Sequence, residues 1–314
     1  MALHRLTSIT LGVPSPEESG SFFTEFGLTE TAPGRFATRD GGEQLVLEHS
    51  PHRQLRRLGV GALDGDDVER LARRVEAWSS SVTVERGVDA AGSPTVTVIE
   101  PVNGLAVHIS VAPPLEVAAV HRPEVNRPAQ QIERRDVPAE AVLAEAPVRV
   151  SNLTHLVYAT PDQPTTLRFF TEALGFEISD EVPGIIAFTR CSEMHHNLAL
   201  QAAPVAFMHH VAFEVDTVDD VVRGGSALVD NDPDRQVWGV GRHAIGSNWF
   251  WYLRDPSGTF VEYTADIDRI TRQDLYAPKQ WVGREFLYSF GPAIPGEFLE
   301  PTDLADLIAA GSLI

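Results

Sequence analysis

Alternating apolar and polar residues mark several short strands, and the clearest lies in the second half of the chain. In the segment HVAFEV, residues 210–215, the apolar residues Val211, Phe213 and Val215 recur at every second position. This period is typical of a β-strand with one face in a hydrophobic core. Alternation places His209 on the apolar face and His210 on the opposite one.

Two further segments show the same alternation and carry polar residues of interest. In TFVEYTAD, residues 259–266, Glu262 lies on the side opposite Val261 and Tyr263. In NLTHLVYAT, residues 152–160, His155 interrupts a run of mostly apolar residues. We expect both segments to be strands of one sheet with the strand at 210–215.

An internal repeat organises these elements. Leu6-Thr7 corresponds to Leu153-Thr154, and the block FFTE at 22–25 corresponds to FFTE at 169–172, with a constant shift of 147 residues (153 − 6 and 169 − 22). Each copy predicts a strand, a proline-containing turn and an amphipathic helix that ends near Gly27 or Gly175. A repeat of this length indicates two similar domains.

We therefore expect four regions along the chain. The N-terminal domain covers residues 1–112 and the second domain covers residues 148–270. Residues 113–147 are rich in proline and charged residues without a sustained period, which is typical of a linker. Residues 271–314 contain several aromatic residues and a short helical pattern, so we expect this tail to pack on the second domain.

Composition restricts the function. A net charge of −19 disfavours nucleic acid and anionic membranes as partners. The single cysteine, Cys191, excludes an intramolecular disulfide and a zinc site built from cysteines. The chain has no run of about 18 apolar residues and no signal-peptide pattern at its start, so a cytoplasmic location is expected.

The two copies differ in residues that can bind a metal ion. The second copy has His155, His210 and Glu262. The first copy has Ser8, Gly59 and His108 at the corresponding places. Two imidazoles and one carboxylate on one face form the facial triad of non-haem Fe(II) oxygenases. A histidine on a strand is more often a hydrogen-bonded core residue, so spacing alone leaves both interpretations open.

The second half resembles the type I extradiol ring-cleavage dioxygenases of the vicinal oxygen chelate superfamily. The likeness is carried by LTHLVYATPD, HHNLALQAAPVAFMHHVAFEV and GRHAIGSNWFWYLRDPSGTFVEYTAD, in that order. It implies an α+β fold of two tandem domains, each of paired βαβββ modules, with mixed sheets curved around a central cleft. It also implies that His155, His210 and Glu262 bind Fe(II), with Mn(II) as the alternative metal.

The same resemblance assigns catalytic residues outside the ligand set. His196 matches the histidine that serves as acid and base near bound dioxygen, with the neighbouring His195 as the competing choice. His243 and Tyr252 match residues that contact the substrate oxygens. The family often has Asp after the acid–base histidine, whereas this chain has Asn197, so the partner that tunes the protonation of the histidine is expected to differ.

The function that the resemblance implies is extradiol cleavage of a substituted catechol with O2, giving a muconic semialdehyde-type product. Trp238, Trp249 and Phe188 are candidate pocket residues, and Trp238 stands where relatives that bind carboxylated catechols can have arginine, which favours an apolar substrate. Relatives are commonly homo-oligomers. Two alternatives are a metal-dependent glyoxalase-like lyase or isomerase and a non-enzymatic small-molecule-binding protein of the same fold.

Overall fold

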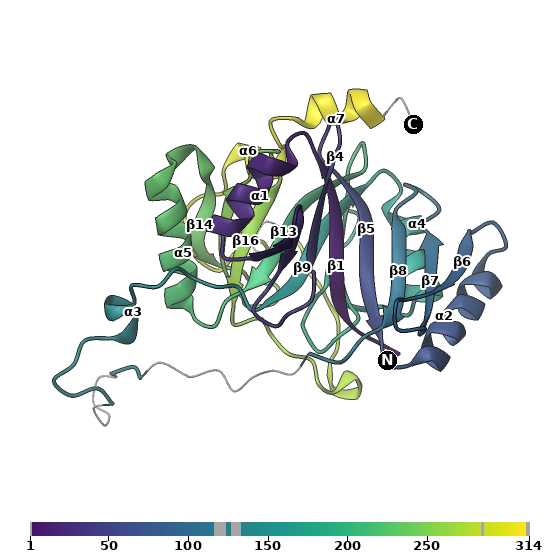
Figure 1. The fold of residues 1–314 in the computed structure, drawn as a ribbon, viewed down its shortest axis with the longest axis horizontal. Coiled ribbons are helices and arrows are strands. Elements are labelled where there is room, and N and C mark those ends of the chain that lie inside the picture. Colours follow the sequence, from purple (N-terminus) through teal and green to yellow (C-terminus); the bar gives the residue numbers. More distant parts are fainter. Residues whose placement is uncertain (1, 116–123, 127–132, 284–285, 312–314) are drawn as a thin grey trace.

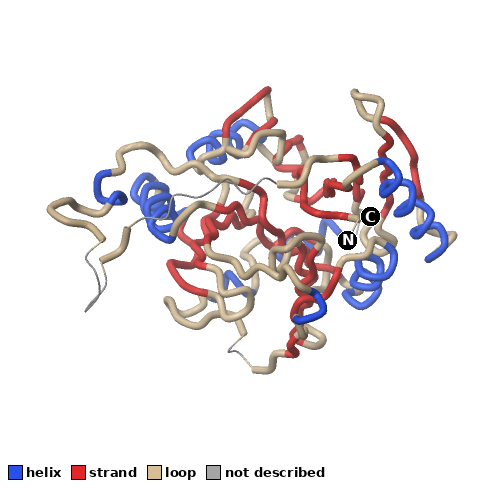
Figure 2. Tube along the Cα trace, turned by 90° about the horizontal axis from the view of Figure 1, so that it is seen from below, coloured by secondary structure: helices blue, strands red, loops and turns tan. Residues whose placement is uncertain are grey.

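The computed structural model describes residues 2–115, 124–126, 133–283 and 286–311 (Figure 1). Its strands form one sheet of eight strands and one of nine, and most of the helices lie around them (Figures 1 and 2). Helices α2 and α5 lie toward opposite ends of the long axis of the molecule, with the strands between them (Figure 1).

The first half of the chain contains two βαβββ modules. The first module consists of β1 (Leu3–Val13), α1 (Pro16–Glu25), β2 (Thr29–Ala32), β3 (Arg35–Ala37) and β4 (Leu45–His49). The second consists of β5 (Gln54–Ala62), α2 (Gly65–Trp78), β6 (Val84–Val88), β7 (Pro94–Ile99) and β8 (Ala106–Val111). Their strands form the eight-stranded sheet, in the order β2-β3-β4-β1-β5-β8-β7-β6.

The second half repeats this arrangement. Its first module consists of β9 (Asn152–Thr160), α4 (Gln163–Arg168) continued by the π-helical turn η1 (Phe169–Ala173), β10 (Glu177–Val182), β11 (Ile186–Arg190) and β12 (Leu198–Ala202). Its second consists of β13 (Phe207–Glu214), α5 (Val218–Asn231), the 3-10 turn η2 (Pro233–Arg235), β14 (Gln236–Arg242), β15 (Trp249–Arg254) and β16 (Phe260–Ala265).

These strands, with β17 (Lys279–Gln280) at one edge, form the nine-stranded sheet β14-β15-β16-β13-β9-β12-β11-β10-β17. Both sheets are mixed, because the first and last strands of a module pair in parallel while their neighbours pair antiparallel. The predicted α+β fold of paired βαβββ modules is confirmed. Within the described residues, no helix has the length and apolar character needed to cross a membrane.

The repeated FFTE block has a structural reason. Phe22 and Phe23 on α1 and Phe169 and Phe170 on η1 are all fully buried, so each copy uses its phenylalanine pair to anchor a helix. The two halves do not have separate cores. The ring of Phe26 stacks on Tyr263 of β16 with centroids 3.8 Å apart, and one hydrophobic cluster includes residues of both sheets.

The segment between the halves was predicted to be a linker over 113–147. Residues 116–123 and 127–132 lie outside the described part of the chain. The short helix α3 (Glu140–Leu143) contacts α5.

The tail crosses the nine-stranded sheet and reaches the first half. It contains the 3-10 turn η3 (Gln273–Leu275), β17, α6 (Gly296–Leu299) and α7 (Leu304–Gly311). Phe298 of α6 packs among aromatic residues of β14, β15 and β16, and Leu307 of α7 packs on Phe207. Asp303 pairs with Arg53, which comes from the first half and also donates to the carbonyl oxygen of Met208.

Candidate active site

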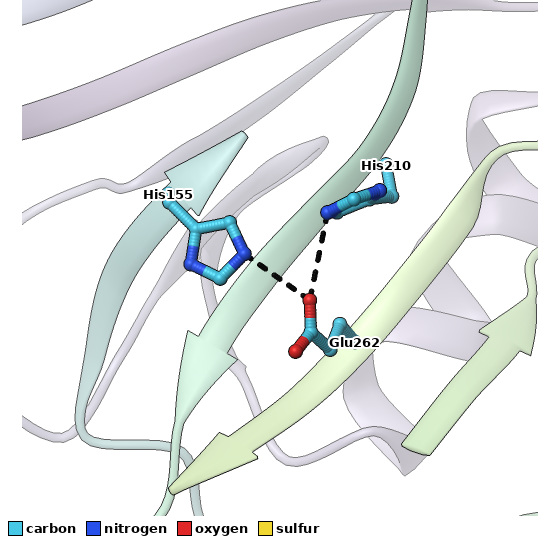
Figure 3. Close-up of side chains that lie close together, drawn as sticks. All are labelled: His155, His210 and Glu262. Atoms are coloured by element: carbon cyan, nitrogen blue, oxygen red, sulfur yellow. Dashed lines mark hydrogen bonds and ion pairs between the residues drawn. The ribbon is translucent and has the colours of Figure 1, made fainter. Parts of the chain in front are cut away.

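Strand register brings the three candidate ligands together. Ala212 of β13 pairs with His155 of β9 on one side and with Glu262 of β16 on the other. His210 lies two residues before Ala212, so its side chain extends from the same face of the sheet. Figure 3 shows the three side chains pointing toward one another from three adjacent strands.

The distances are those of a potential metal site. Nε2 of His155 lies 3.2 Å and Nε2 of His210 lies 3.5 Å from the same oxygen, Oε2, of Glu262 (Figure 3). The three donor atoms lie within 4.8 Å of one another, and all three side chains are buried. They form the one group of three or more His, Cys, Asp or Glu side chains with this spacing among the described residues.

Among the described residues of the first half, the corresponding row of paired residues contains one histidine and no carboxylate. Ser8 of β1 pairs with Gly59 of β5, which pairs with His108 of β8. This row corresponds to His155, Ala212 and Glu262, so Gly59 stands at the place of Ala212 rather than of His210. The predicted correspondence between Gly59 and His210 is therefore wrong by two residues, because Gly59 corresponds to Ala212.

Alternation along β13 is interrupted at the histidine pair. The strand has a bulge between Met208 and His210, so His209 has no direct partner on β9. A bulge re-aims side chains, and both His209 and His210 line the same cavity. The prediction that His209 faces away from His210 is wrong, because alternation along the strand does not reveal a bulge.

Hydrogen bonds define which nitrogen of His210 is free. Nε2 of His209 lies 2.6 Å from the carbonyl oxygen of Phe298, which can only accept, so His209 carries its hydrogen there. Burial lowers the pKa of His209 to about 4, and the neutral ring then accepts at Nδ1 from Nδ1 of His210, 2.9 Å away. Nε2 of His210 is left with a lone pair directed toward Glu262.

Asn248 holds the carboxylate of Glu262. Its Nδ2 donates to Oε1 of Glu262 at 3.0 Å and to Thr264 at 2.8 Å, leaving Oε2 for the two imidazoles. Sequence reasoning missed Asn248. The signal was present, because Asn248 directly precedes β15 and lies four residues before Tyr252, so alternation continued by one residue assigns both to the same face.

These residues fit a divalent metal ion. A fully buried carboxylate needs a cationic partner or a metal, and Glu262 has two imidazole nitrogens and an amide around it. Burial, followed by the neighbouring imidazoles, lowers the pKa of His210 well below its usual value, so its ring is neutral as a ligand must be. Nδ1 of His155 is buried without a hydrogen-bond partner.

The other predicted residues surround this group. His196 lines the cavity with its ring centroid 4.3 Å from that of His155, whereas His195 lies behind it. Tyr252 pairs in register with Glu262, and its hydroxyl lies 2.8 Å from Nε2 of His243. Nδ1 of His243 faces the carbonyl oxygen of Leu287 at 2.5 Å and therefore carries a hydrogen, which leaves Nε2 to accept from Tyr252.

The cavity above the triad has apolar walls. Its volume of about 120 Å³ is close to the roughly 150 Å³ of a protein cavity that holds one benzene ring. Apolar side chains supply most of the lining, including Val157, Ile186, Phe188, Ile245, Leu287 and Phe298. None of the described residues that line it is Lys, Arg, Asp or Glu.

The three candidate pocket residues differ in position. Phe188 lines the cavity. Trp238 is outside the lining, because its indole is buried beneath Tyr252 and Phe298, and Trp249 is outside because it packs on Phe290 and Arg242. The cavity is lined instead by three residues that were not predicted, Phe286, Leu287 and Phe298. They lie in the irregular tail, where no periodic pattern indicates which residues face inward.

Comparison with known proteins shows what the chain is similar to. Residues 152–263 match the model of the glyoxalase/bleomycin resistance protein/dioxygenase superfamily. This part of the chain is thus similar to that superfamily. It is 28% identical over 309 residues to metapyrocatechase 2 of Cupriavidus necator, covering 96% of this chain and 93% of that relative.

Two further similarities bear on the extradiol branch of the superfamily. A biphenyl-2,3-diol 1,2-dioxygenase of Metapseudomonas furukawaii is 34% identical over 145 residues, covering 41% of this chain and 46% of that protein. The structure of a halotolerant catechol dioxygenase aligns with a TM-score of 0.73 at 20% identity, covering 97% of this chain and 96% of the other. The resemblance to extradiol dioxygenases is confirmed.

Proposed function

We propose that the protein is an extradiol dioxygenase that cleaves a catechol bearing an apolar substituent, using O2 and a divalent metal held by His155, His210 and Glu262. The observation that carries the proposal is this triad, whose two histidines line an apolar cavity about the size of one aromatic ring. The relatives' names as metapyrocatechase and dioxygenase support it.

The metal is proposed to be Fe(II), as the resemblance to extradiol dioxygenases implies, with Mn(II) as the alternative. Two imidazoles and one carboxylate suit either ion, since selectivity in such sites depends on geometry and availability. When bound, the ion would hold the diol and O2 next to each other and conduct electrons between them.

The surrounding residues would manage protons and charge. Nδ1 of His196 is engaged by His195, so Nε2 is the nitrogen that remains to accept a proton from a diol hydroxyl in the cavity. Tyr252 donates its hydroxyl hydrogen to Nε2 of His243 beside the triad, and this hydrogen would be redirected to a substrate oxygen on which negative charge develops. The apolar walls exclude water from the ring.

Oxygen uptake with a panel of catechols tests this function. The protein is purified without oxygen, loaded with Fe(II) or Mn(II), and mixed with 3-alkyl- or 3-aryl-catechols or with 3,4-dihydroxybenzoate. We expect one O2 consumed per catechol, a yellow ring-opened product, and a kcat/KM at least about 100-fold higher for the apolar substrates, because a carboxylate in this cavity would be desolvated without a partner.

Two outcomes would contradict the proposal. Preference for the carboxylated catechol would refute the substrate class. Absence of oxygen uptake with every vicinal diol, in protein that retains a stoichiometric metal ion, would refute the dioxygenase function and favour a glyoxalase-like activity, which consumes no O2.

A further inference from the structure

A second histidine pair, His195–His196, connects the cavity to a buried carboxylate. Nδ1 of His196 lies 3.1 Å from Nδ1 of His195. His195 is itself buried, and its Nε2 faces away from the cavity toward Tyr276 and Asp180. The chain of groups thus runs from the cavity-lining imidazole to the tail of the protein.

Hydrogen-bond directions along this chain are defined by Asp180. The hydroxyl of Tyr276 donates to Oδ1 of Asp180 at 3.3 Å, so the oxygen of Tyr276 accepts from Nε2 of His195 at 3.2 Å. Oδ2 of Asp180 also lies 3.5 Å from Nε2 of His195. His195 therefore carries a hydrogen on Nε2, and its Nδ1 accepts from Nδ1 of His196.

The carboxylate of Asp180 is buried and held by three neutral donors. The amide of Lys279 and the indole of Trp281 each donate to it at 2.8 Å, in addition to Tyr276. Among the described residues, His195 is the side chain beside Asp180 that can become a cation. A buried carboxylate favours a cationic partner, and an imidazolium formed at His195 would lie next to Asp180.

We propose that His195 and Asp180 form a proton relay behind His196, in which His195 keeps Nε2 of His196 free to accept a proton in the cavity. This inference rests on the proposed function. When Nε2 of His196 accepts the proton of a diol hydroxyl, the hydrogen on its Nδ1 passes to Nδ1 of His195. The resulting imidazolium pairs with Asp180, and the reverse transfers return the proton to the product.

Burial raises the pKa of the Asp180 carboxyl, but the hydrogen bonds from His195, the Lys279 amide and Trp281 outweigh it and keep that pKa below its usual value. The carboxylate is thus ionised at neutral pH. The arrangement parallels the carboxylate of a catalytic triad, which orients an imidazole and stabilises its protonated form without taking the proton. Here the orientation is transmitted through a second imidazole.

The first test reads the tautomers directly and needs no activity. In metal-free protein labelled with ¹⁵N-histidine, long-range ¹H–¹⁵N correlations at neutral pH should place the hydrogen of His195 on Nε2 and that of His196 on Nδ1. Signals are assigned by comparison with His195→Gln and His196→Gln. A hydrogen on Nδ1 of neutral His195 would overturn the relay, even if the protein proves inactive with catechols.

The second test separates a relay from a structural role. Asp180→Asn should lower kcat by about 10- to 100-fold, a usual effect of removing an outer partner of a site histidine, while the KM for the catechol changes less than twofold. The solvent deuterium isotope effect on kcat should rise, because proton transfer becomes slower.

The matched control is Glu181→Gln. Glu181 is the next residue of β10 and accepts from Gln280 of the same tail strand, but it does not contact His195. This variant should keep the wild-type kcat and isotope effect. If Asp180→Asn kept a kcat within twofold of wild type, the relay would be refuted. Wild-type protein without oxygen uptake would instead refute the proposed function, and the tautomer measurement would still decide the relay geometry.

Discussion

In both histidine pairs of the second half, neighbouring residues of the chain are joined through their Nδ1 atoms. The separation is 3.1 Å between His195 and His196 and 2.9 Å between His209 and His210. Beyond each pair, the outer histidine meets an acceptor, the hydroxyl of Tyr276 or the carbonyl of Phe298. A side chain at the site is thus oriented by a residue of the tail.

Replacing Glu262 by Gln should abolish metal binding without unfolding the protein. Glu262 supplies the negative charge of the proposed donor set, so we expect Glu262→Gln to lower metal affinity by at least about 100-fold. Anaerobic titration with Fe(II) or Mn(II) measures this. Glu214→Gln is the control, because Glu214 lies on β13 but pairs with Arg269 outside the site; unchanged affinity in Glu262→Gln would contradict the ligand assignment.

His209→Ala should have an intermediate effect. Strand alternation alone predicts that this variant keeps its activity. From the structure we expect His209→Ala to lower metal affinity by about 10- to 100-fold. In this variant Nδ1 of His210 has lost its acceptor, so the ring is no longer held in its orientation. His210→Ala should lose more. Equal affinities of wild type and His209→Ala would show that the hydrogen bond between the two rings has no role in binding.

Asp180 should contribute to stability in a pH-dependent way. Its pKa is lower in the folded protein than the usual value near 3.8, so the unfolded chain binds more protons there and the contribution is present above about pH 4 and lost below it. Urea midpoints of wild type and Asp180→Asn should therefore differ at pH 6 and converge toward pH 3. A gap that widens on acidification would contradict the lowered pKa.

At the level of elements, alternation and the repeat predicted a strand, a turn and a helix in each half and the faces of His210 and Glu262, whereas the βαβββ modules and the ligand set came from the resemblance to extradiol dioxygenases. They could not predict the bulge at His209, because a bulge depends on the pairing of β13 with β9 rather than on composition. Trp238 was expected in the pocket, but the pocket wall at this place is α6. A four-residue helix in a proline-rich tail has no periodicity from which its inward face can be inferred.

Phe298 gives α6 a measurable role in substrate binding. Its ring packs on Tyr252 with centroids 4.6 Å apart and lines the cavity. Phe298→Ala should open the cavity to water and raise the KM for an apolar catechol by about 10-fold, since removing a buried ring costs apolar contact. Phe290→Ala is the control, because Phe290 is half exposed and lies outside the lining. Equal KM values in both variants would exclude this role of α6.

At the scale of the whole molecule, Arg53 connects three parts of the chain. The guanidinium is 3% exposed, pairs with Asp303 of the tail and donates to the carbonyl oxygen of Met208 beside the bulge. Arg53→Met should lower the free energy of unfolding by about 1 to 3 kcal/mol, because the carboxylate of Asp303, which is 30% exposed, and the carbonyl of Met208 lose their charged partner.

The comparison for this prediction is Arg56→Met. Arg56 forms an exposed pair with Glu48 and should contribute about 0 to 1 kcal/mol. Urea denaturation measures both variants. If Arg53→Met unfolds at the same urea concentration as Arg56→Met, the connection between the tail and the first half does not stabilise the fold.

The stacking of Phe26 on Tyr263 has a consequence for any attempt to reduce this protein to a smaller catalyst. Tyr263 directly follows Glu262 on β16, with its ring on the opposite face of the sheet, against the first half. Cutting the chain between the halves would expose that face and leave the strand beneath the metal ligands without its support. Among the described residues the first half holds no such triad, yet we expect a second half produced alone to be less stable than the chain that contains both halves.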